Sequence, residues 1–445
     1  MTRFQRRLYY AGAMLLFLVL APAVVLYAVG YRVDVTNWSV YRTGIFVVAS
    51  TPRGARVSIN GELAGYTPMR IEHLRPDTYT VAVDRDGYGR WQKQLTIRAS
   101  EAVIVDDIVL FPNTLSVTSL DHTIPSETFV SPSRQSMLVV DTVDLHTTTS
   151  ATWYLNDAVT DSSTFTGEVI DVQWNQSERD IAIVTQSGES SYRLWLWSRG
   201  SDVTPLNVAN VMFHDPPRLT WVQDQPFVLA VQYETAVTFH NAGGETNRAS
   251  VPLDRGDSLL HVRSHDVYVI DVNGAVVRVQ SSLNPVIRTT VQRTGPGTYG
   301  TSASLSSELA IVKRSSPDAL IAIDASTETA RFTVHETFTG FSGRLQDEQW
   351  IAWSSYELTA IRGAGERTLI TRISEPIRAA SWLPNHKYVV YLSGGTLTAI
   401  EFDSRDRRNQ MDLVNGIDGL LTSGDDTKPW TVVRDGALAE MTIVP

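Results

Sequence analysis

The run Asp180-Ile-Ala-Ile-Val184 is a short apolar strand pattern that directly follows the polar turn Asn175-Gln-Ser-Glu-Arg179. Seven more runs of this kind occur along the chain: Ser136–Val140, Phe227–Val231, Val267–Ile270, Leu309–Val312, Trp350–Trp353, Tyr388–Tyr391 and Trp430–Val433. Successive runs start 38 to 47 residues apart. Regular spacing near forty residues, with strand patterns and no helical ones, predicts a repeated unit of antiparallel sheet.

Neighbouring residues extend each run into a larger unit. Trp174, Trp221 and Trp382 each stand just before the polar turn of their unit, and strand patterns such as Tyr192–Trp197 and Thr396–Ile400 follow the run. Units of several short strands at this spacing are typical of a β-propeller. We therefore predict a propeller over residues 113–445, with eight blades and with seven as the alternative.

The last unit lacks an outer strand. It ends with Leu438–Ile443, whereas Thr114–Leu120 is a strand pattern that precedes the first complete unit and belongs to none. We predict that this first strand completes the last blade and closes the ring, which leaves no exposed sheet edge there. Trp195 and Trp197 lie on one face of their strand, and we expect them to pack between blades rather than to stack on a ligand.

Residues 44–112 contain a second set of short alternating runs, namely Ile45–Ser50, Arg56–Asn60, Thr78–Asp84, Lys93–Ala99 and Ala102–Phe111. Gly, Pro and Asn turns separate them, and Asn60-Gly61 is a strong hairpin signal because both positions of such a turn need a positive φ. Alternation with period two predicts antiparallel strands and no helix. We expect Tyr88 and Trp91 to pack on this sheet, and Asp84-Arg-Asp-Gly87 to form a turn rather than a calcium loop.

These residues resemble the PEGA domain. The resemblance rests on Pro52, Gly54, Ala55, Asn60, Gly61, Gly65, Thr67, Pro68, Gly87 and Tyr88, in the order and spacing of that family. The chain departs from the pattern at Arg53, where the family has Glu, and at Asp77, where it has Gly. The resemblance implies a small β-sandwich-like module outside the cytoplasm that serves as a spacer or a contact, without catalysis. The later repeats resemble the WD-like and TolB-like propeller repeats of envelope proteins in layout, without a complete Trp-Asp signature.

The chain begins with a segment that can cross a membrane. Leu8 to Tyr31 carry no charge, and three basic residues, Arg3, Arg6 and Arg7, precede them. We predict a cytoplasmic N-terminus over 1–7, a transmembrane signal anchor over 8–31 and a linker over 32–43, since basic flanks stay in the cytoplasm. The alternative is a cleaved signal peptide with Ala21-Pro-Ala23 as the cleavage site.

The chain has 445 residues and a net charge of −10, which argues against a nucleic-acid partner. Residues 1–43 have a net charge of +4, residues 44–112 are neutral and residues 113–445 have −14, so the acidic part is far from the anchor. The absence of cysteine excludes disulfides, cysteine–zinc sites and thiol catalysis. The net charge of −14 over residues 113–445 suits a soluble part that faces away from an anionic membrane surface.

No hydrolase elbow (G-x-S-x-G) and no G-x-x-x-x-G-K phosphate loop occurs in the sequence. His261, His265 and Asp266 are the closest approach to a metal-ligand set, and they need a turn between them to meet, so we do not predict a site there. The pairs Asp106-Asp107 and Asp425-Asp426 could indicate acid–base chemistry or calcium, but we expect surface positions. We expect Arg405-Asp-Arg-Arg408 to be a hairpin loop.

The sequence thus predicts an all-β protein with one N-terminal transmembrane helix, a PEGA module and a propeller. We predict no catalytic, cofactor-binding or metal site. The expected function is a membrane-anchored, extracytoplasmic binding or scaffold protein of a bacterial cell envelope, whose propeller loops bind an envelope protein or cell-wall polysaccharide. The alternative is a propeller glycosidase or lyase acting on surface polysaccharide, with carboxylates from several blades at the central channel.

Overall fold

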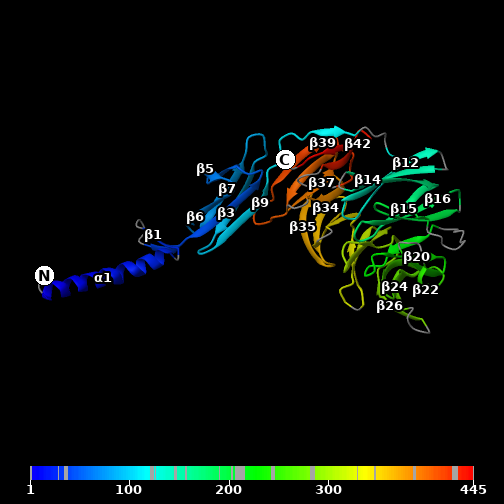
Figure 1. The fold of residues 1–445 in the computed structure, drawn as a ribbon, viewed down its shortest axis with the longest axis horizontal. Helices are drawn as coiled ribbons and strands as arrows, with labels where there is room; N and C mark the ends of the chain where they lie inside the picture. The colour runs from blue at the N-terminus through cyan, green and yellow to red at the C-terminus, as the bar shows by residue number, and fades with distance from the viewer. Residues whose placement is uncertain are drawn as a thin grey trace. The chain divides into compact units, whose positions relative to one another are not determined.

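The computed structural model describes residues 3–28, 30–34, 39–120, 125, 127–144, 148–155, 158–189, 191–201, 204–205, 216–241, 246–280, 286–327, 329–344, 347–383, 387–422 and 429–443. The chain forms two compact units. Unit 1 comprises Met1–Asn113, Asp403–Met411 and Val444–Pro445, and unit 2 comprises Thr114–Phe402 and Asp412–Ile443. Figure 1 draws unit 1 mainly in blue and cyan and the strands of unit 2 from cyan to red.

Unit 1 begins with helix α1, Arg3–Ala28. Its stretch Phe4–Ala28 contains an 18-residue segment with a mean hydropathy of 2.3, and none of that segment is buried in the protein. At a rise of about 1.5 Å per residue, such a helix is about 39 Å long, enough to cross a hydrocarbon layer of about 30 Å. The helix is therefore a candidate membrane span, as an anchor or as a signal peptide.

A short hairpin follows the helix. Strands β1 (Tyr31–Asp34) and β2 (Ser39–Arg42) are antiparallel; apart from Tyr31, which the sequence analysis places in the anchor, they lie in the predicted linker 32–43. The backbone N–H of Thr43 donates to the carbonyl of Gly30 over 3.0 Å. This bond closes the base of the hairpin at the end of the helix.

The PEGA module consists of two sheets around one core. The first has the order β6-β3-β9 and the second β5-β4-β7-β8. Their bounds are β3 Gly44–Thr51, β4 Arg56–Ile59, β5 Glu62–Tyr66, β6 Met69–Leu74, β7 Asp77–Asp84, β8 Trp91–Ile97 and β9 Ala102–Val109. The core contains Phe46, Val57, Val83, Trp91 and Ile108, all at most 2% exposed.

Two features differ from the sequence-based expectations for this module. Strands β5 and β6 were not predicted; none of their eleven side chains is fully buried, and the apolar Leu63 and Tyr66 are exposed. β3 and β9 pair in parallel, so the prediction of purely antiparallel strands is wrong. A parallel pair needs a long connection, and here the whole module between the first and the last strand supplies it.

Residues 403–411, which we call the clasp, belong to unit 1 although they connect β38 and β39 of the propeller. Their side chains cover open sheet edges. Asn409 Oδ1 and Asp406 Oδ2 accept hydrogen bonds from the backbone N–H groups of Gln92 and Gln94 on edge strand β8. Arg405 donates to the carbonyl of Ile104 on edge strand β9. The expected loop at Arg405–Arg408 is present, and it also satisfies backbone groups that would otherwise be free to pair with another chain.

Unit 2 is built from consecutive sheets, most of which are simple four-stranded meanders of neighbouring strands. The first sheet contains β11 Glu127–Val130, β12 Ser136–Asp144, β13 Thr148–Leu155 and β14 Ala158–Thr166, and the second contains β15 Glu168–Trp174, β16 Asp180–Gln186, β17 Tyr192–Ser198 and β18 Thr204–Pro205. The third sheet contains β19 Arg218–Trp221, β20 Val228–Tyr233, β21 Ala236–Asn241 and β22 Thr246–Pro252. The fourth contains β23 Ser258–Arg263, β24 Asp266–Ile270, β25 Ala275–Gln280 and β26 Ile287–Arg293.

The fifth sheet contains β27 Thr298–Tyr299, β28 Ala303–Ser304, β29 Leu309–Ser315, β30 Ala319–Asp324 and β31 Arg331–Glu336. The sixth contains β32 Gly340–Arg344, β33 Asp347–Trp353, β34 Glu357–Arg362 and β35 Glu366–Arg372, and the seventh contains β36 Ile377–Trp382, β37 Tyr388–Ser393, β38 Thr396–Glu401 and β39 Gln410–Asn415. The last sheet includes β40 Gly419–Leu420, β41 Trp430–Arg434 and β42 Ala437–Met441. Eight sheets can be followed over the described residues. Eight blades remains our prediction for the whole ring, with seven as the alternative.

The apolar runs that predicted the repeat lie in the strand after the first turn of each sheet, namely β12, β16, β20, β24, β29, β33, β37 and β41. Trp174, Trp221 and Trp382 each end the first strand of their sheet and are at most 7% exposed. The apolar run of each unit is buried because it is covered on both faces by neighbouring sheets. The all-β fold with a propeller is confirmed.

Apolar clusters join each sheet to the next around the ring. Leu138 of β12 packs with Ile181 of β16 in one cluster, and similar clusters join later neighbours. Met137 and Tyr154 of the first sheet pack with Leu438 of the last sheet. The ring therefore closes, as face-to-face packing of successive sheets requires.

The closing strand is the one predicted from the sequence. β10 (Val117–Ser119) pairs with β42 in an antiparallel register, Val117 opposite Met441. It forms the outer strand of the last sheet, whose order is β10-β42-β41-β40. The tryptophan prediction is also confirmed: Trp197 is 1% exposed and lies with Trp153 of β13 in the cluster between the first two sheets, and Trp195 packs against the same cluster.

Candidate functional site

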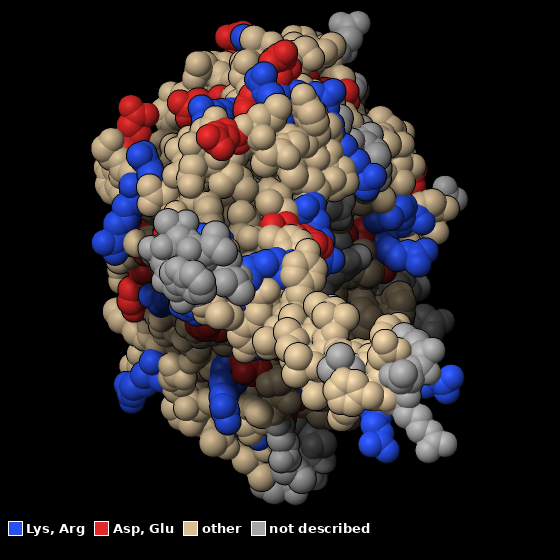
Figure 2. All heavy atoms as spheres, turned by 90° about the vertical axis from the view of Figure 1, so that its left-hand side faces the viewer, with Lys and Arg blue, Asp and Glu red and all other residues tan. Residues whose placement is uncertain are grey.

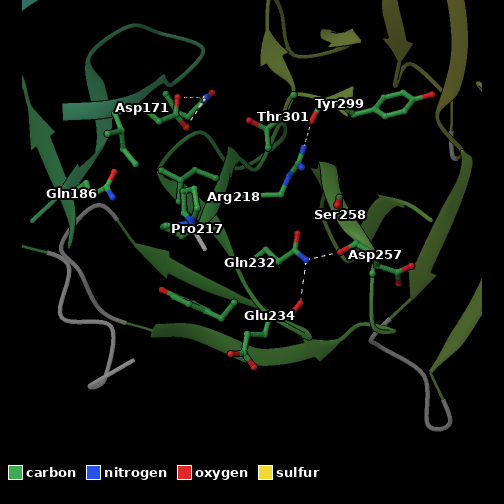
Figure 3. A pocket seen from close by; sticks show the side chains of 17 residues that line it. Asp171, Gln186, Pro217, Arg218, Gln232, Glu234, Asp257, Ser258, Tyr299 and Thr301 are labelled. Atoms are coloured by element: carbon green, nitrogen blue, oxygen red, sulfur yellow. Dashed lines mark hydrogen bonds between the residues drawn. The ribbon is translucent and has the colours of Figure 1, made fainter. Parts of the chain in front are cut away.

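The propeller unit contains a pocket of about 830 Å³ between four successive sheets. Residues of the inner strands β15, β19, β23 and β27 line it, together with the end of β20 and the turn that follows β20. Figure 3 shows Asp171, Arg218, Gln232 and Tyr299 around this space. Because inner strands of four blades contribute, the pocket lies toward the axis of the ring.

A β-bulge positions the acidic group of this pocket. The pairing of β15 with β16 shifts by one residue between Val169 and Asp171. Such bulges redirect side chains and are frequent beside functional sites. The carboxylate of Asp171 accepts a hydrogen bond from Gln173 Nε2 at 3.1 Å. Burial raises the pKa of Asp171, and the bond from Gln173 and the charge of Arg218 only partly oppose this.

The basic group of the pocket is Arg218, the first residue of β19. Burial lowers the pKa of its guanidinium, and the charge of Asp171 opposes that shift. One of its terminal nitrogens donates to the carbonyl of Tyr299, as Figure 3 shows. Its Nε is buried and has no hydrogen-bond partner among the described residues. The guanidinium of Arg218 is therefore incompletely hydrogen-bonded within the described residues.

The opposite wall is fixed by an internal network. Gln232 Nε2 donates to the carbonyl of Asp257 at 2.7 Å, and Gln232 Oε1 accepts from the N–H of Leu259 at 2.6 Å. The carboxylate of Asp257 forms an ion pair with Arg288 at 2.5 Å. These side chains use their hydrogen bonds on each other, so the wall is rigid. Glu234 lies at the rim, in the turn after β20.

The first turns of several sheets also meet, and they form a second polar cluster in unit 2. Arg134 donates to the carbonyl of Leu420 at 2.5 Å, and its guanidinium lies 5.6 Å from the ring centre of Trp353. Glu178 accepts from the N–H of Ser133 at 3.3 Å. Burial lowers the pKa of Arg134 to about 10 and raises the pKa of Glu178. This cluster joins residues of the first, second, sixth and last sheets, and Glu178 Oε2 is buried in it without a hydrogen-bond partner among the described residues.

The histidine cluster considered in the sequence is not assembled. A turn separates His261 of β23 from Asp266 of β24, but His261 is buried and its Nδ1 bonds with Ser302 Oγ at 2.9 Å. His265 is exposed and Asp266 forms an ion pair with Arg278 at 2.6 Å. Over the residues that the structure describes, no group of three or more metal-ligating side chains comes together.

The carboxylate pairs lie elsewhere. Asp106 is exposed and Asp107 half-buried on β9 of the PEGA module. Asp425 and Asp426 lie outside the described residues. Asp84-Arg-Asp-Gly87 ends β7 and turns, with the N–H of Tyr88 bonded to the carbonyl of Arg85. Tyr88 and Trp91 both pack with the core of the PEGA module.

The residues that carry the PEGA resemblance lie at turns and in a small buried hydrogen-bond network. Thr67 Oγ1 bonds with Ser50 Oγ at 2.7 Å and accepts from the N–H of Ala55 at 3.1 Å. Asn60 and Gly61 have φ values of 50° and 89°, as a two-residue hairpin turn between β4 and β5 requires. Pro52 and Pro68 follow cis peptide bonds, and Gly54, Gly65 and Gly87 have positive φ.

Of the three basic residues that predicted the topology, Arg6 and Arg7 are exposed on α1, and the side chain of Arg3 lies outside the described residues. Figure 2 shows the side of the molecule with the left-hand end of Figure 1 in front, where Lys and Arg are interspersed with Asp and Glu.

The sequence did not single out Asp171 or Arg218. A bulge is invisible in an alternating pattern, and the two residues are far from each other along the chain.

Residues 43–108 match the PEGA domain family model. No curated protein matches the chain. Among solved structures, the C-terminal WD40 domain of Sif2 is similar, with 11% identity over 75% of this chain and 99% of that one and a TM-score of 0.46. The β-propeller domain of Myceliophteria thermophila Cps50 (Swd1) has 12% identity over 63% of this chain and 98% of that one, with a TM-score of 0.36.

Proposed function

We propose that this chain is a membrane-anchored binding or scaffold protein of the cell envelope, and that its propeller holds a partner at the pocket of Asp171 and Arg218. The observation that carries the proposal is the pocket itself, with a bulge-positioned carboxyl group and an incompletely bonded guanidinium in one space. A concave pocket with a small number of placed polar groups is the usual form of a binding site.

The proposed topology follows from α1. The basic residues before the helix favour a cytoplasmic N-terminus, which leaves both the PEGA module and the propeller outside the cytoplasm. The PEGA module then serves as a spacer or as a contact with the wall or another protein. Tethering raises the local concentration of the propeller near any envelope partner. The partner class that we favour is an envelope protein, and cell-wall polysaccharide is the other candidate.

Crosslinking in intact envelopes tests this proposal. A photoreactive residue replaces Glu234 at the rim of the pocket in the full chain, and as a control it replaces Tyr356, which is 53% exposed and is not among the residues that line the pocket. We expect a discrete adduct from position 234 only, and its loss when Arg218→Gln is added. An adduct from both positions, or from neither, contradicts binding at this pocket. Co-sedimentation of the full chain with isolated cell walls separates the two partner classes.

One observation favours a propeller glycosidase or lyase as the second candidate. The raised pKa of Asp171 is a property of a general acid. Such an enzyme also needs a second carboxylate as the base or nucleophile. Asp257 lines the same pocket, but its carboxylate forms an ion pair with Arg288. Turnover of surface polysaccharide by the wild-type chain, lost in Asp171→Asn, would replace the binding proposal with this one.

A further inference from the structure

We propose that the hairpin after α1 forms a binding surface for the phosphate groups of anionic phospholipids. The inference rests on the membrane anchoring in the proposed function and concerns a different part of the molecule from the propeller pocket. The surface, which we call the collar, comprises Tyr27, the hairpin residues Tyr31, Arg32, Tyr41 and Arg42, and Arg75.

The collar contains three stacked arginine–tyrosine pairs. The guanidinium of Arg32 lies 3.7 Å from the ring centre of Tyr27, and that of Arg42 lies 4.8 Å from the ring centre of Tyr31. The guanidinium of Arg75, which follows β6, lies 4.9 Å from the ring centre of Tyr41 and donates to its hydroxyl at 3.2 Å. Stacking covers the flat face of a guanidinium and leaves the N–H groups at its edge able to bond phosphate oxygens.

Strand pairing fixes this arrangement. Tyr31 lies opposite Arg42, and Arg32 lies opposite Tyr41, in the register of β1 and β2. Arg32 also donates to the carbonyls of Tyr27 and Tyr31, at 2.9 and 3.0 Å. The first of these carbonyls belongs to the last turn of α1, which is where a positive charge is favourable. The hairpin is thereby connected to the end of the helix.

Within the described part of the chain, carboxylates do not offset the charges of the two hairpin arginines. Among the described residues, no ion pair involves Arg32 or Arg42. The Nε of Arg42 is buried and has no hydrogen-bond partner there. An arginine without a counter-charge, fixed on a tyrosine, favours a phosphate ligand because the guanidinium can bond two of its oxygens.

A pocket of about 330 Å³ lies beside the collar, and its charged lining residues are Arg32, Arg70, Glu72 and Glu101. Arg70 pairs with Glu72 at 2.8 Å, and Glu101 accepts a hydrogen bond from the backbone N–H of Arg98 at 3.1 Å. Arg32 is thus the guanidinium of this lining that forms no ion pair among the described residues. The pocket gives space for a phosphate and its glycerol next to Arg32.

The position of the collar along the chain matches the position of lipid headgroups. From Leu8 to Ala28 the helix is about 31 Å long, close to the hydrocarbon thickness of about 30 Å. Tyr27 then lies at the boundary, where tyrosine is favoured. Arg32 follows the helix closely and Arg42 lies opposite Tyr31 in the hairpin, so we expect both at the level of the phosphates. This spacing favours a lipid headgroup over a soluble phosphate compound.

The test measures lipid retention by the full chain. The detergent-solubilised protein is titrated with phosphatidylglycerol or phosphatidylcholine, and native mass spectrometry counts the bound lipids. We expect preferential retention of phosphatidylglycerol, which falls about fivefold for each arginine removed in Arg32→Gln and in Arg32→Gln/Arg42→Gln. Arg42→Lys retains the charge and should recover part of the preference. The matched control, Arg53→Gln/Arg90→Gln, removes two exposed PEGA arginines and should leave retention unchanged.

Each other outcome contradicts the inference. Equal retention of both lipids, or an unchanged preference in the double variant, shows that the collar is not the binding surface. Competition by inorganic phosphate at equal concentration shows a site for the free anion rather than for lipid. Extraction of membranes with alkaline carbonate checks the anchoring separately: a chain released from membranes contradicts the proposed function, whereas a retained chain without lipid preference contradicts only the collar.

Discussion

The ammonium group of Lys93 lies 3.2 Å from the carboxylate of Asp403 and donates to its backbone carbonyl at 2.7 Å. The Lys93 side chain is fully buried, whereas that of Asp403 is 13% exposed. Lys93 is on edge strand β8 of the PEGA module, and Asp403 begins the clasp. A buried ammonium is tolerated only with a nearby acceptor. This pair therefore holds the clasp on the sheet.

Lys93→Met should destabilise unit 1, because it leaves the Asp403 carboxylate without its buried partner. Removal of one member of a buried pair costs about 3–5 kcal/mol, and the packing of the methionine side chain should recover part of this. Hydrogen exchange of the β8 amides measures the effect, since the clasp also accepts bonds from Gln92 and Gln94. Lys313→Met, at an exposed position, is the control. Unchanged exchange of β8 in Lys93→Met would show that the pair does not hold the clasp.

The same contact should depend on pH. Burial by itself raises the pKa of Asp403, but hydrogen bonds from Arg405 and the charges of Lys93 and Arg405 outweigh it and bring the pKa to about 2. A carboxyl with a lower pKa in the folded state contributes stability above its unfolded pKa of about 3.8, and this contribution is lost as the pH falls toward 2.

We therefore expect exchange at β8 to accelerate between pH 4 and 2 in the wild type, after correction for the intrinsic exchange rate. In Asp403→Asn the protection should be lower at pH 6 and should change less over the same range. If Asp403→Asn showed the same pH dependence of exchange as the wild type, another carboxyl group would be responsible for the acceleration.

The clasp also shows where sequence-based prediction stops. The alternation in Ile45–Ser50 and the runs near every fortieth residue report burial on a local scale, and they predicted the core strands and the closing strand β10 correctly. The contact of Lys93 with Asp403 spans 310 residues. No local pattern indicates that a basic loop in an acidic propeller belongs to another unit.

The candidate pocket is a similar case. Asp171 follows a bulge and Arg218 begins another strand, so their meeting depends on how two blades pack. The parallel pairing of β3 and β9 also depends on tertiary structure, because alternation is the same in both kinds of sheet. Periodicity predicts which face of a strand is buried, whereas strand direction and site geometry follow from packing.

His261 should make the propeller sensitive to mild acid. Burial, together with the charge of Arg263, lowers the pKa of His261 to about 3, whereas an unfolded chain binds the proton near pH 6.5. The unfolded state therefore binds more protons between these pH values, and the free energy of unfolding falls as the pH decreases, by up to about 1.4 kcal/mol per unit.

Denaturant unfolding of the full chain at pH 7 and pH 5 measures this effect. We expect a smaller difference between the two pH values in His261→Leu than in the wild type. His335, whose pKa burial lowers to about 4, should account for part of the remaining difference. The double variant His261→Leu/His335→Leu should therefore show the weakest pH dependence. Equal pH dependence in all three proteins would exclude both histidines as the cause.

Closure of the propeller ring can be tested at a single backbone bond. The N–H of Leu120 donates to the carbonyl of Leu438 at 2.9 Å, directly after the pairing of β10 with β42. The Leu120 side chain also packs against the cluster between the first and last sheets. Leu120→Pro removes the donor and the side chain, whereas Leu120→Ala removes only the side chain.

The difference between these two variants isolates the backbone bond from the packing. We expect Leu120→Pro to be less stable than Leu120→Ala by at least about 1 kcal/mol, since a buried carbonyl loses its donor. Amides of β42 should exchange faster in Leu120→Pro, and those of β24 on the other side of the ring should not. If the ring closed without β10, both variants would unfold alike and β42 would keep its protection. Faster exchange in all sheets of Leu120→Pro would instead show that the propeller unfolds as one cooperative unit once β10 is lost.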